Sequence, residues 1–177
     1  MFSNIYENKK VLVTGHTGFK GTWLTAWLLK LGANVVGISK DIPTTPSMFE
    51  ELNLNEKISH YLEDIRDLSK ITQIISDEKP EFLFHLAAQP IVSSSYSDPI
   101  ETISSNVMGT ANILEALKIS NHKCTAIIIT SDKAYDNEEQ VWGYKEEDKM
   151  GGKDIYSGSK GATELIIKSY YHSFFKS

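Results

Sequence analysis

Tyr156 and Lys160 stand four residues apart in the sequence YSGSK, and together they could move a proton. On a helix this spacing places the two side chains on one face. A tyrosine acts as a base near neutral pH only when its pKa falls from about 10, and a nearby ammonium group favours the phenolate. The spacing by itself is a weak signal, because Tyr6 and Lys10 repeat it before the first apolar run. A solvated helix face is the alternative interpretation.

Three further reactive side chains follow an apolar run in the sequence ITSDKAY. Ser131, Asp132 and Lys133 offer a hydroxyl, an acid and a base in adjacent positions. Acids and bases transfer protons when they lie within hydrogen-bond reach of a substrate and have suitable pKa values. A polar turn at the end of a buried strand would have the same composition, so this interpretation stays open beside the catalytic one.

Glycine recurs at every third position from residue 15 to residue 21, directly after the apolar run VLVT. Glycines in a strand-to-helix turn let the backbone approach a pyrophosphate, which the exposed N–H groups and the dipole of the helix then hold. The spacing therefore predicts a dinucleotide site, although a bare tight turn would also use glycine. The predicted cofactor-binding residues of this turn are Gly15, Thr17, Gly18, Phe19, Lys20 and Gly21.

An acidic residue about 20 positions after the last glycine of such a turn binds the adenosine ribose. Asp41 lies at that distance from Gly21, since 41 − 21 = 20. It falls just beyond the predicted strand, where Ser39 holds the last strand position. An acid here favours NAD over NADP, whereas the neighbouring Lys40 weakens that preference.

Five short apolar runs predict the strands that must position these residues: 11–14, 34–39, 59–63, 82–87 and 126–130. Most of them lack polar alternation, as strands covered on both faces do. Between them, apolar residues recur with helical spacing at Trp23, Leu24, Trp27, Leu28 and Leu31, at Leu68, Ile71, Ile74 and Ile75, and at Val107, Ala111, Leu114 and Leu117. Alternating strands and helices predict a Rossmann-type doubly wound parallel sheet in three α/β/α layers. No linker divides the chain, so residues 1–177 are expected to form one domain.

Composition and charge exclude several classes of protein. The chain has 18 basic and 23 acidic residues and a net charge of −5. Because no basic run is longer than Lys9 and Lys10, we expect no nucleic-acid partner. No apolar window has the length of a signal peptide or a membrane span, so we expect no membrane association. Cys124 is the only cysteine, which excludes an internal disulfide and favours a core thiol in a cytoplasmic protein.

The whole set of motifs resembles the CDP-glucose 4,6-dehydratases of the extended short-chain dehydrogenase/reductase superfamily. The resemblance rests on VLVTGHTGFKGTWLTAWL, PTTPSMFE, DIRD, FHLAAQPIV, SYSDPIETISSNVMGT, TSDKAYDN and WGYKEEDKMGGKDIYSGSKGATELI. Ile155 and Gly158 depart from the family, which usually has proline and Asn or Ser at these positions. Members of the family continue into a C-terminal part that binds the nucleotide sugar, and we expect that part to be absent from this chain.

The resemblance implies a reaction in which NAD is reduced and reoxidised within one turnover. Tyr156 would take the proton of the sugar 4-hydroxyl while hydride leaves C4, with Ser131 positioning that hydroxyl and Lys160 beside the tyrosine. The resulting ketone acidifies the proton on C5. Asp132 would then act as the acid and Lys133 as the base of an elimination at C5 and C6, and hydride would return to C6. The product implied by the resemblance would be CDP-4-dehydro-6-deoxyglucose.

The resemblance also assigns further cofactor-binding residues and a partner. Asp64 and Ile65 match an adenine-contacting pair, although an N-cap at Asp64 or Asp67 would explain the acid equally well. Besides Tyr156 and Lys160, the remaining expected cofactor-binding residues are Leu86, Ala87, Ala88, Gln89, Asn106 and Thr130. Family members pair through the helices near Asn106 and Tyr156, so a homodimer is expected. We expect no metal site and interpret His85 as structural.

Two other functions remain open at the level of the sequence. One is a nucleotide-sugar epimerase, or a dehydratase for another nucleotide, which would lack the combination of Lys133 and the WGY loop. The other is a non-catalytic module that only binds NAD. Trp142 and Tyr144 of the WGY loop could shape a sugar pocket or only hold the loop.

Overall fold

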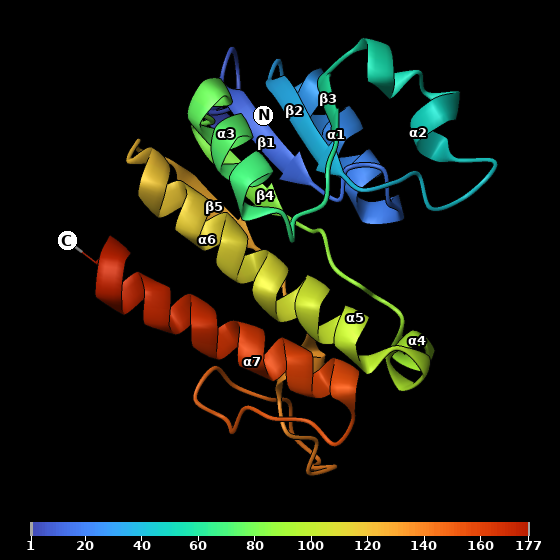
Figure 1. Ribbon diagram of the computed structural model, residues 1–177, viewed down its shortest axis with the longest axis vertical. Coiled ribbons are helices and arrows are strands. Elements are labelled where there is room, and N and C mark those ends of the chain that lie inside the picture. The colour runs from blue at the N-terminus through green and yellow to red at the C-terminus, as the bar shows by residue number, and fades with distance from the viewer. Residues whose placement is uncertain (1, 177) are drawn as a thin grey trace.

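The computed structural model describes residues 2–176, which form a five-stranded parallel sheet (Figure 1). The strand order is β3-β2-β1-β4-β5. The strands are β1 (Lys10–Thr14), β2 (Asn34–Ser39), β3 (Ser59–Leu62), β4 (Phe82–His85) and β5 (Thr125–Ile128). The five predicted strands and their parallel, doubly wound order are thus confirmed. The chain reverses its direction across the sheet between β1 and β4, which is where ligands bind in sheets of this kind.

The fourth strand ends at His85 instead of residue 87 as the sequence suggested. Thr14, at the end of β1, explains the difference, because its hydroxyl oxygen accepts the backbone N–H groups of Leu86 at 3.2 Å and Ala87 at 3.1 Å. The Leu86 N–H also donates to the backbone carbonyl of Thr14 at 3.1 Å, whereas the Ala87 N–H turns to the side chain of Thr14. The chain therefore turns away from the sheet two residues early, at the edge that carries the candidate site.

Helices cover both faces of the sheet, which confirms the three predicted layers (Figure 1). On one face lie α3 (Leu68–Glu78) and α6 (Gly109–Ser120), whose apolar side chains pack against Leu12 and Leu83. On the other lies α1 (Phe19–Lys30) against Val11 and Val13. The long helix α7 (Ile155–Tyr170) runs alongside α6. The shorter helical segments are η1 (Phe2–Asn4), α2 (Met48–Glu51), η2 (Leu54–Glu56), α4 (Val92–Ser97), α5 (Pro99–Ile103), η3 (Ser104–Met108), η4 (Asp132–Ala134) and η5 (Tyr171–Phe175).

The first helix turns only part of the apolar set that its spacing suggested toward the core, including Leu24 and Leu28. Thr22, Thr25 and Leu28 are buried, whereas Trp23 and Trp27 are 59% and 48% exposed. A Cβ atom at Gly21 would lie 2.0 Å from the carbonyl oxygen of Gly15, so the helix begins in direct contact with the preceding turn. Such a close approach favours threonine over tryptophan on the inner face. The spacing predicts the helix and its leucine contacts correctly but not the exposure of the two tryptophans.

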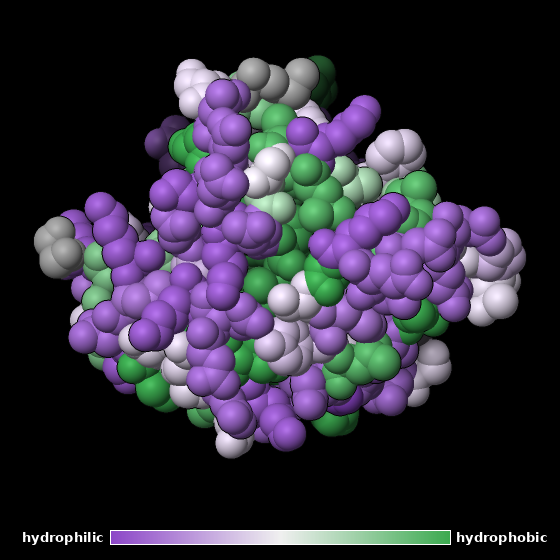
Figure 2. Space-filling model, turned by 90° about the horizontal axis from the view of Figure 1, so that it is seen from above, coloured by the Kyte–Doolittle hydropathy of each residue, from purple (hydrophilic) through white to green (hydrophobic). Residues whose placement is uncertain are grey.

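The surface is mostly polar with local apolar areas. Seen from above, hydrophilic side chains cover most of the visible face, and apolar side chains reach the surface near its centre (Figure 2). No helix among residues 2–176 is long and apolar enough to cross a membrane. The Cys124 thiol packs partly buried against the core, and burial raises its pKa to about 11, so it is held as a neutral thiol.

Candidate active site

A cleft of about 540 Å³ opens at the carboxyl ends of the strands. It runs from the glycine turn after β1, past the ends of β2 and β3, to the first turns of α7. Every predicted cofactor-binding residue except Asn106 lines it, namely Gly15, Thr17, Gly18, Phe19, Lys20, Gly21, Asp41, Asp64, Ile65, Leu86, Ala87, Ala88, Gln89, Thr130, Tyr156 and Lys160. Segments far apart in the sequence are therefore brought to one cavity.

The glycine turn lines the cleft and packs closely against the segment that follows β4. Gly15 has a φ of +73°, and a Cβ atom there would lie 2.8 Å from the backbone nitrogen of Ala87. Gly18 forms the N-cap of α1 and makes no side-chain hydrogen bond to it. The first N–H groups of α1 thus have no capping side chain and can be offered to an anion.

Under this turn lies a histidine pair that the sequence did not reveal. His16 is fully buried, its Nε2 lies 2.7 Å from Nδ1 of His60, and its Nδ1 lies 3.0 Å from the hydroxyl of Ser39. A Cβ atom at Gly37 would lie 2.5 Å from the His16 ring. Burial, followed by the charge of His60, lowers the pKa of His16 to about 4, so the ring is neutral at pH 7. The pair ties the glycine turn to β2 and β3.

His85 forms a second buried connection. Its Nδ1 lies 2.6 Å from the Thr14 hydroxyl and its Nε2 lies 3.0 Å from the Thr110 hydroxyl, which donates to the carbonyl of Asn106 at 2.8 Å. Burial and then the charge of Lys160 lower the pKa of His85 to about 3. These contacts support its interpretation as structural. Among residues 2–176 no group of three or more His, Cys, Asp or Glu side chains is placed to hold a metal ion.

Acid is expected to destabilise this fold well before its carboxylates titrate. His16 and His85 have pKa values of about 4 and about 3, below the ordinary value of 6.5. Because the folded state binds fewer protons, their contribution to stability is complete above pH 6.5 and declines as the pH falls toward these values. The expected loss between pH 7 and pH 5 is on the order of 2 kcal/mol for each histidine. Urea unfolding at pH 7 and pH 5 measures this loss of unfolding free energy. His16→Gln should reduce the difference between the two pH values by about half. Equal stabilities of the unaltered chain at both pH values would contradict this expectation.

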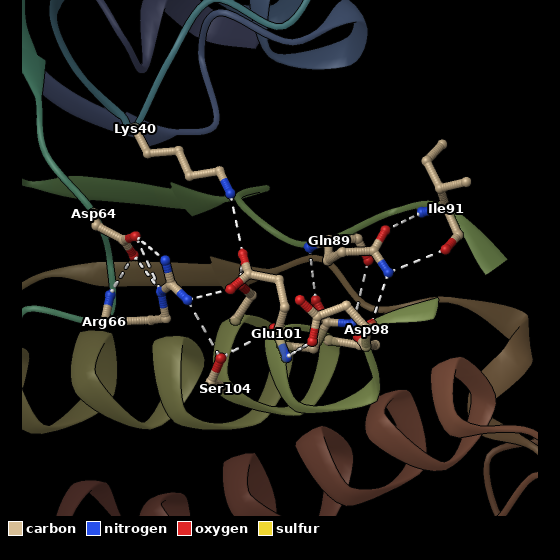
Figure 3. Close-up of polar contacts among 11 residues, drawn as sticks. Lys40, Asp64, Arg66, Gln89, Ile91, Asp98, Glu101 and Ser104 are labelled. Atoms are coloured by element: carbon tan, nitrogen blue, oxygen red, sulfur yellow. Dashed lines mark hydrogen bonds and ion pairs between the residues drawn. The ribbon is translucent and has the colours of Figure 1, made fainter. Parts of the chain in front are cut away.

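The end of the cleft beside β2 and β3 carries two of the predicted acids. The Thr17 hydroxyl donates to the backbone carbonyl of Asp41 at 2.7 Å, which fixes the chain after β2 beside the glycine turn. Asp64 accepts the backbone N–H of Arg66 at 2.9 Å and binds its guanidinium group (Figure 3). The N-cap of α3 is Asp67, which accepts the N–H of Lys70 at 3.1 Å. Helix capping therefore accounts for Asp67 and leaves Asp64 facing the cleft.

Asn106 lies behind the cleft instead of lining it. It is buried in the π-helical segment η3, and its Oδ1 accepts the backbone N–H of Gln89 at 2.8 Å. Its Nδ2 donates to the Ser159 hydroxyl at 2.9 Å. A π-helical turn widens the helix locally and often occurs at functional sites. Asn106 thus connects one wall of the cleft with α7, next to Lys160.

Tyr156 and Lys160 occupy the first turns of α7, which begins at the N-cap Asp154. Both side chains are buried, and Lys160 Nζ lies 5.8 Å from the centre of the Tyr156 ring. Burial and the charges of Asp132 and Asp154 raise the pKa of Tyr156, although the Ser131 hydroxyl counteracts them. Burial lowers the pKa of Lys160. The chain alone therefore does not lower the pKa of Tyr156, and the phenolate requires a further positive charge.

The other predicted catalytic residues lie beside the cleft. Ser131 accepts the N–H of Lys133 at 3.2 Å and donates to the Asp132 carboxylate at 3.0 Å, which shapes the short helix η4. Asp132 and Lys133 are exposed. In the following loop Tyr144 stacks on Tyr135 with ring centres 5.3 Å apart, so at least Tyr144 holds the loop together.

Fold and cleft together define a dinucleotide-binding domain of the short-chain dehydrogenase/reductase type. The chain belongs to the GDP-mannose 4,6 dehydratase family, whose model matches residues 12–175. It is 51% identical over 172 residues to the CDP-glucose 4,6-dehydratase of Salmonella typhimurium, with 97% of this chain and 48% of that protein covered. The chain thus spans about half the length of this relative.

Solved structures show the same architecture. The UDP-glucuronic acid 4-epimerase of Bacillus cereus, in complex with UDP-glucuronic acid and NAD, matches with a TM-score of 0.81 and 30% identity over 94% of this chain and 53% of that one. The UDP-glucose 4-epimerase of Thermus thermophilus, in complex with NAD, gives a TM-score of 0.79 and 26% identity over 94% of this chain and 52% of that one. Both neighbours are enzymes with bound NAD.

Proposed function

We propose that this chain is the NAD-binding part of a nucleotide-sugar 4,6-dehydratase that converts CDP-glucose to CDP-4-dehydro-6-deoxyglucose. One observation carries the proposal: the glycine turn and the Tyr156–Lys160 face of α7 line one cleft at the point where the sheet reverses. The similarity to the Salmonella typhimurium enzyme supports CDP-glucose as the substrate. Residues 1–177 would form its single Rossmann domain, and the nucleotide-sugar-binding part would lie outside this chain.

The residues of the cleft fit NAD. The close packing at Gly15 and Gly21 sets the course of a turn that lines the cleft, and a pyrophosphate there would be bound by the N–H groups of α1. Asp41 would bind the adenosine ribose, and Asp64 with Ile65 the adenine. The segment from Leu86 to Gln89 and Thr130 would lie along the nicotinamide half. The chemistry that NAD would supply in this position is hydride transfer between C4 and C6 of the sugar.

Residues of this chain would carry out the proton transfers. Tyr156 would take the proton of the sugar 4-hydroxyl, which Ser131 positions, once the positive nicotinamide ring adds to the charge of Lys160 and favours the phenolate. Asp132 would protonate the departing 6-hydroxyl and Lys133 would remove the C5 proton. Both side chains are exposed beside the cleft, so a substrate entering from its open side would meet them.

Lys133 distinguishes elimination from simple cofactor binding. The test uses a chimera in which this chain replaces the matching half of the Salmonella typhimurium enzyme. Lys133→Met should leave the NAD dissociation constant unchanged and lower the rate of dehydration by about a hundredfold or more, the usual contribution of a general base. Lys153, an exposed lysine of the loop that leads into α7, offers the matched control Lys153→Met, which should keep full activity. An unchanged rate of dehydration in Lys133→Met would show that Lys133 is not the base and would favour a purely structural role for the TSDK segment.

Binding to the chain itself separates the remaining functions. Calorimetry with NAD and with CDP-glucose should detect NAD binding to residues 1–177. If the chimera binds both ligands but forms no dehydrated product, a non-catalytic module is the better interpretation. If the chimera interconverts sugar epimers instead, an epimerase is the better interpretation.

A cytoplasmic location fits the unpaired Cys124 thiol, since disulfides form mainly in oxidising compartments.

We also propose a homodimer formed through α6 and α7. Large apolar side chains are exposed on and around these helices, among them Met108 at 53%, Leu165 at 56% and Phe174 at 54%. Burying such side chains against a second copy would stabilise the pair, because each fully buried one contributes about 1.5–3 kcal/mol. Light scattering should give a dimer mass for the chain and a monomer mass for Leu165→Lys. A monomeric unaltered chain would refute this proposal.

A further inference from the structure

Lys40 lines the adenosine end of the cleft, Arg66 lies beside it, and both cations are engaged by acids (Figure 3). Lys40 extends from the end of β2 toward α5, where its Nζ lies 3.1 Å from Oε1 of Glu101. Arg66 reaches the other carboxylate oxygen of Glu101, and its Nε lies 3.0 Å from Asp64. Glu101 is therefore the common partner of both cations.

The position of Lys40 matters for the choice of cofactor. The residues just after β2 are those that meet the ribose of the adenosine in a doubly wound fold. A carboxylate there accepts the ribose 2′-hydroxyl of NAD, whereas a cation there binds the 2′-phosphate of NADP. Asp41 and Lys40 stand side by side and line the same cleft, so the sequence alone supports both dinucleotides.

Glu101 is held in a fixed position beside Lys40, where its charge can affect the choice between NAD and NADP. Its backbone N–H is fixed by the N-cap Asp98 at 2.9 Å, and the Ser105 hydroxyl donates to its Oε1 at 3.2 Å. Its side chain is 26% exposed, against 52% for Lys40, so the acid is the fixed member of the pair. Burial raises the pKa of Glu101, but the hydrogen bond from Lys40 and the charges of Lys40 and Arg66 outweigh burial and lower it overall. Glu101 is thus ionised at neutral pH.

We propose that Glu101 is a specificity-determining residue that makes the cleft select NAD over NADP. It holds Lys40 in an ion pair across the adenosine end, so that this ammonium group is not available to a 2′-phosphate, and it adds a negative charge that repels one. Arg66 is held in the same way and additionally by Asp64. The inference rests on the proposed NAD site and assigns the discrimination to α5, a segment that the spacing rule for the ribose acid does not include.

Glu101→Gln tests the inference by freeing Lys40 while keeping the shape of the side chain. The dissociation constants of NAD and NADP are measured by calorimetry on the chain at low ionic strength. We expect the ratio of NADP to NAD affinity to rise about tenfold, which corresponds to one favourable charge contact. The double variant Glu101→Gln with Lys40→Met should lose this gain. An unchanged ratio in Glu101→Gln, or a gain that persists in the double variant, would overturn the inference.

Glu63→Gln is the matched control. Glu63 lines the same cleft, but its cationic neighbour is Lys70, with Nζ at 3.7 Å. Removing its charge should therefore leave the affinity ratio nearly unchanged. An equal gain in Glu63→Gln would show that any lost negative charge suffices, which contradicts a specific role for Glu101.

Lys40→Met alone gives a second measurement that does not depend on the folding of Glu101→Gln. Because the Lys40 ammonium group is already paired with Glu101, removing it should change the NADP affinity by no more than about twofold. This change is smaller than the contribution of one weak surface ion pair. A clear loss of NADP affinity would show that Lys40 contacts the 2′-phosphate despite Glu101, and would refute the inference. Failure of the unaltered chain to bind NAD would refute the proposed cofactor site as well. NAD binding by the unaltered chain, together with an unchanged ratio of NADP to NAD affinity in Glu101→Gln, would refute this inference alone.

Discussion

Replacing Tyr156 with phenylalanine is expected to lower the rate of CDP-glucose dehydration in the chimera by about a thousandfold, within the range that a positioned base contributes. The change removes only the hydroxyl group, which is the proposed proton acceptor at the sugar 4-hydroxyl. The ring stays buried against Lys160, so the wall of the cleft is retained. NAD affinity should therefore change little, and the loss should fall on kcat.

Tyr6 offers a control with the same sequence spacing. It precedes Lys10 by four residues, as Tyr156 precedes Lys160. Its ring packs on Phe82 with centres 5.1 Å apart, and it does not belong to the cleft lining. Tyr6→Phe should keep full activity. Product formation at the normal rate by Tyr156→Phe would show that another group accepts the proton.

The second large effect is expected at Gly21. A Cβ atom there would lie 2.0 Å from the carbonyl oxygen of Gly15 and 2.7 Å from Cα of His16. Both neighbours are backbone atoms, so the turn must open to accommodate a methyl group. Gly21→Ala should cost about 3 kcal/mol of unfolding free energy, the upper range of overpacking, and abolish measurable NAD binding. Urea unfolding and calorimetry on the chain measure the two effects.

Gly158 provides the opposite case in the same protein. It lies in the first turns of α7 and has no atom within 4 Å of the position of a Cβ. Gly158→Ala should therefore raise the unfolding free energy by about 0.5–1 kcal/mol, because alanine favours the helix. If Gly21→Ala were as stable as the unaltered chain and bound NAD normally, close packing of the turn would not be what the site requires.

Local patterns explain why so much of the fold could be predicted. Each apolar run and the glycine spacing at residues 15–21 depend on neighbours within a few positions, and the structure confirms all five strands. The end of β4 could not be predicted, because it depends on the hydroxyl of Thr14, which is far away in sequence. The tryptophans of α1 could not be placed either, since the buried face is set by contact with the turn.

The candidate site shows the same limit. Its residues could be found from motifs, but the contacts that hold them join distant positions, such as His16 with His60 and Lys40 with Glu101. The pKa of Tyr156 depends on burial and on nearby acids, which spacing does not report. Asn106 was identified through family resemblance, yet only the structure places it behind the cleft wall.

The most direct test of the dehydratase proposal follows one hydrogen atom. CDP-glucose carrying deuterium at C4 is incubated with NAD and the chimera, and the product is analysed by NMR. The account predicts a 4-keto-6-deoxy sugar with deuterium at C6, because the hydride removed from C4 returns to C6 in the same site. A sugar that keeps its 6-hydroxyl and carries deuterium at a C4 of inverted configuration would contradict the proposal and identify an epimerase instead.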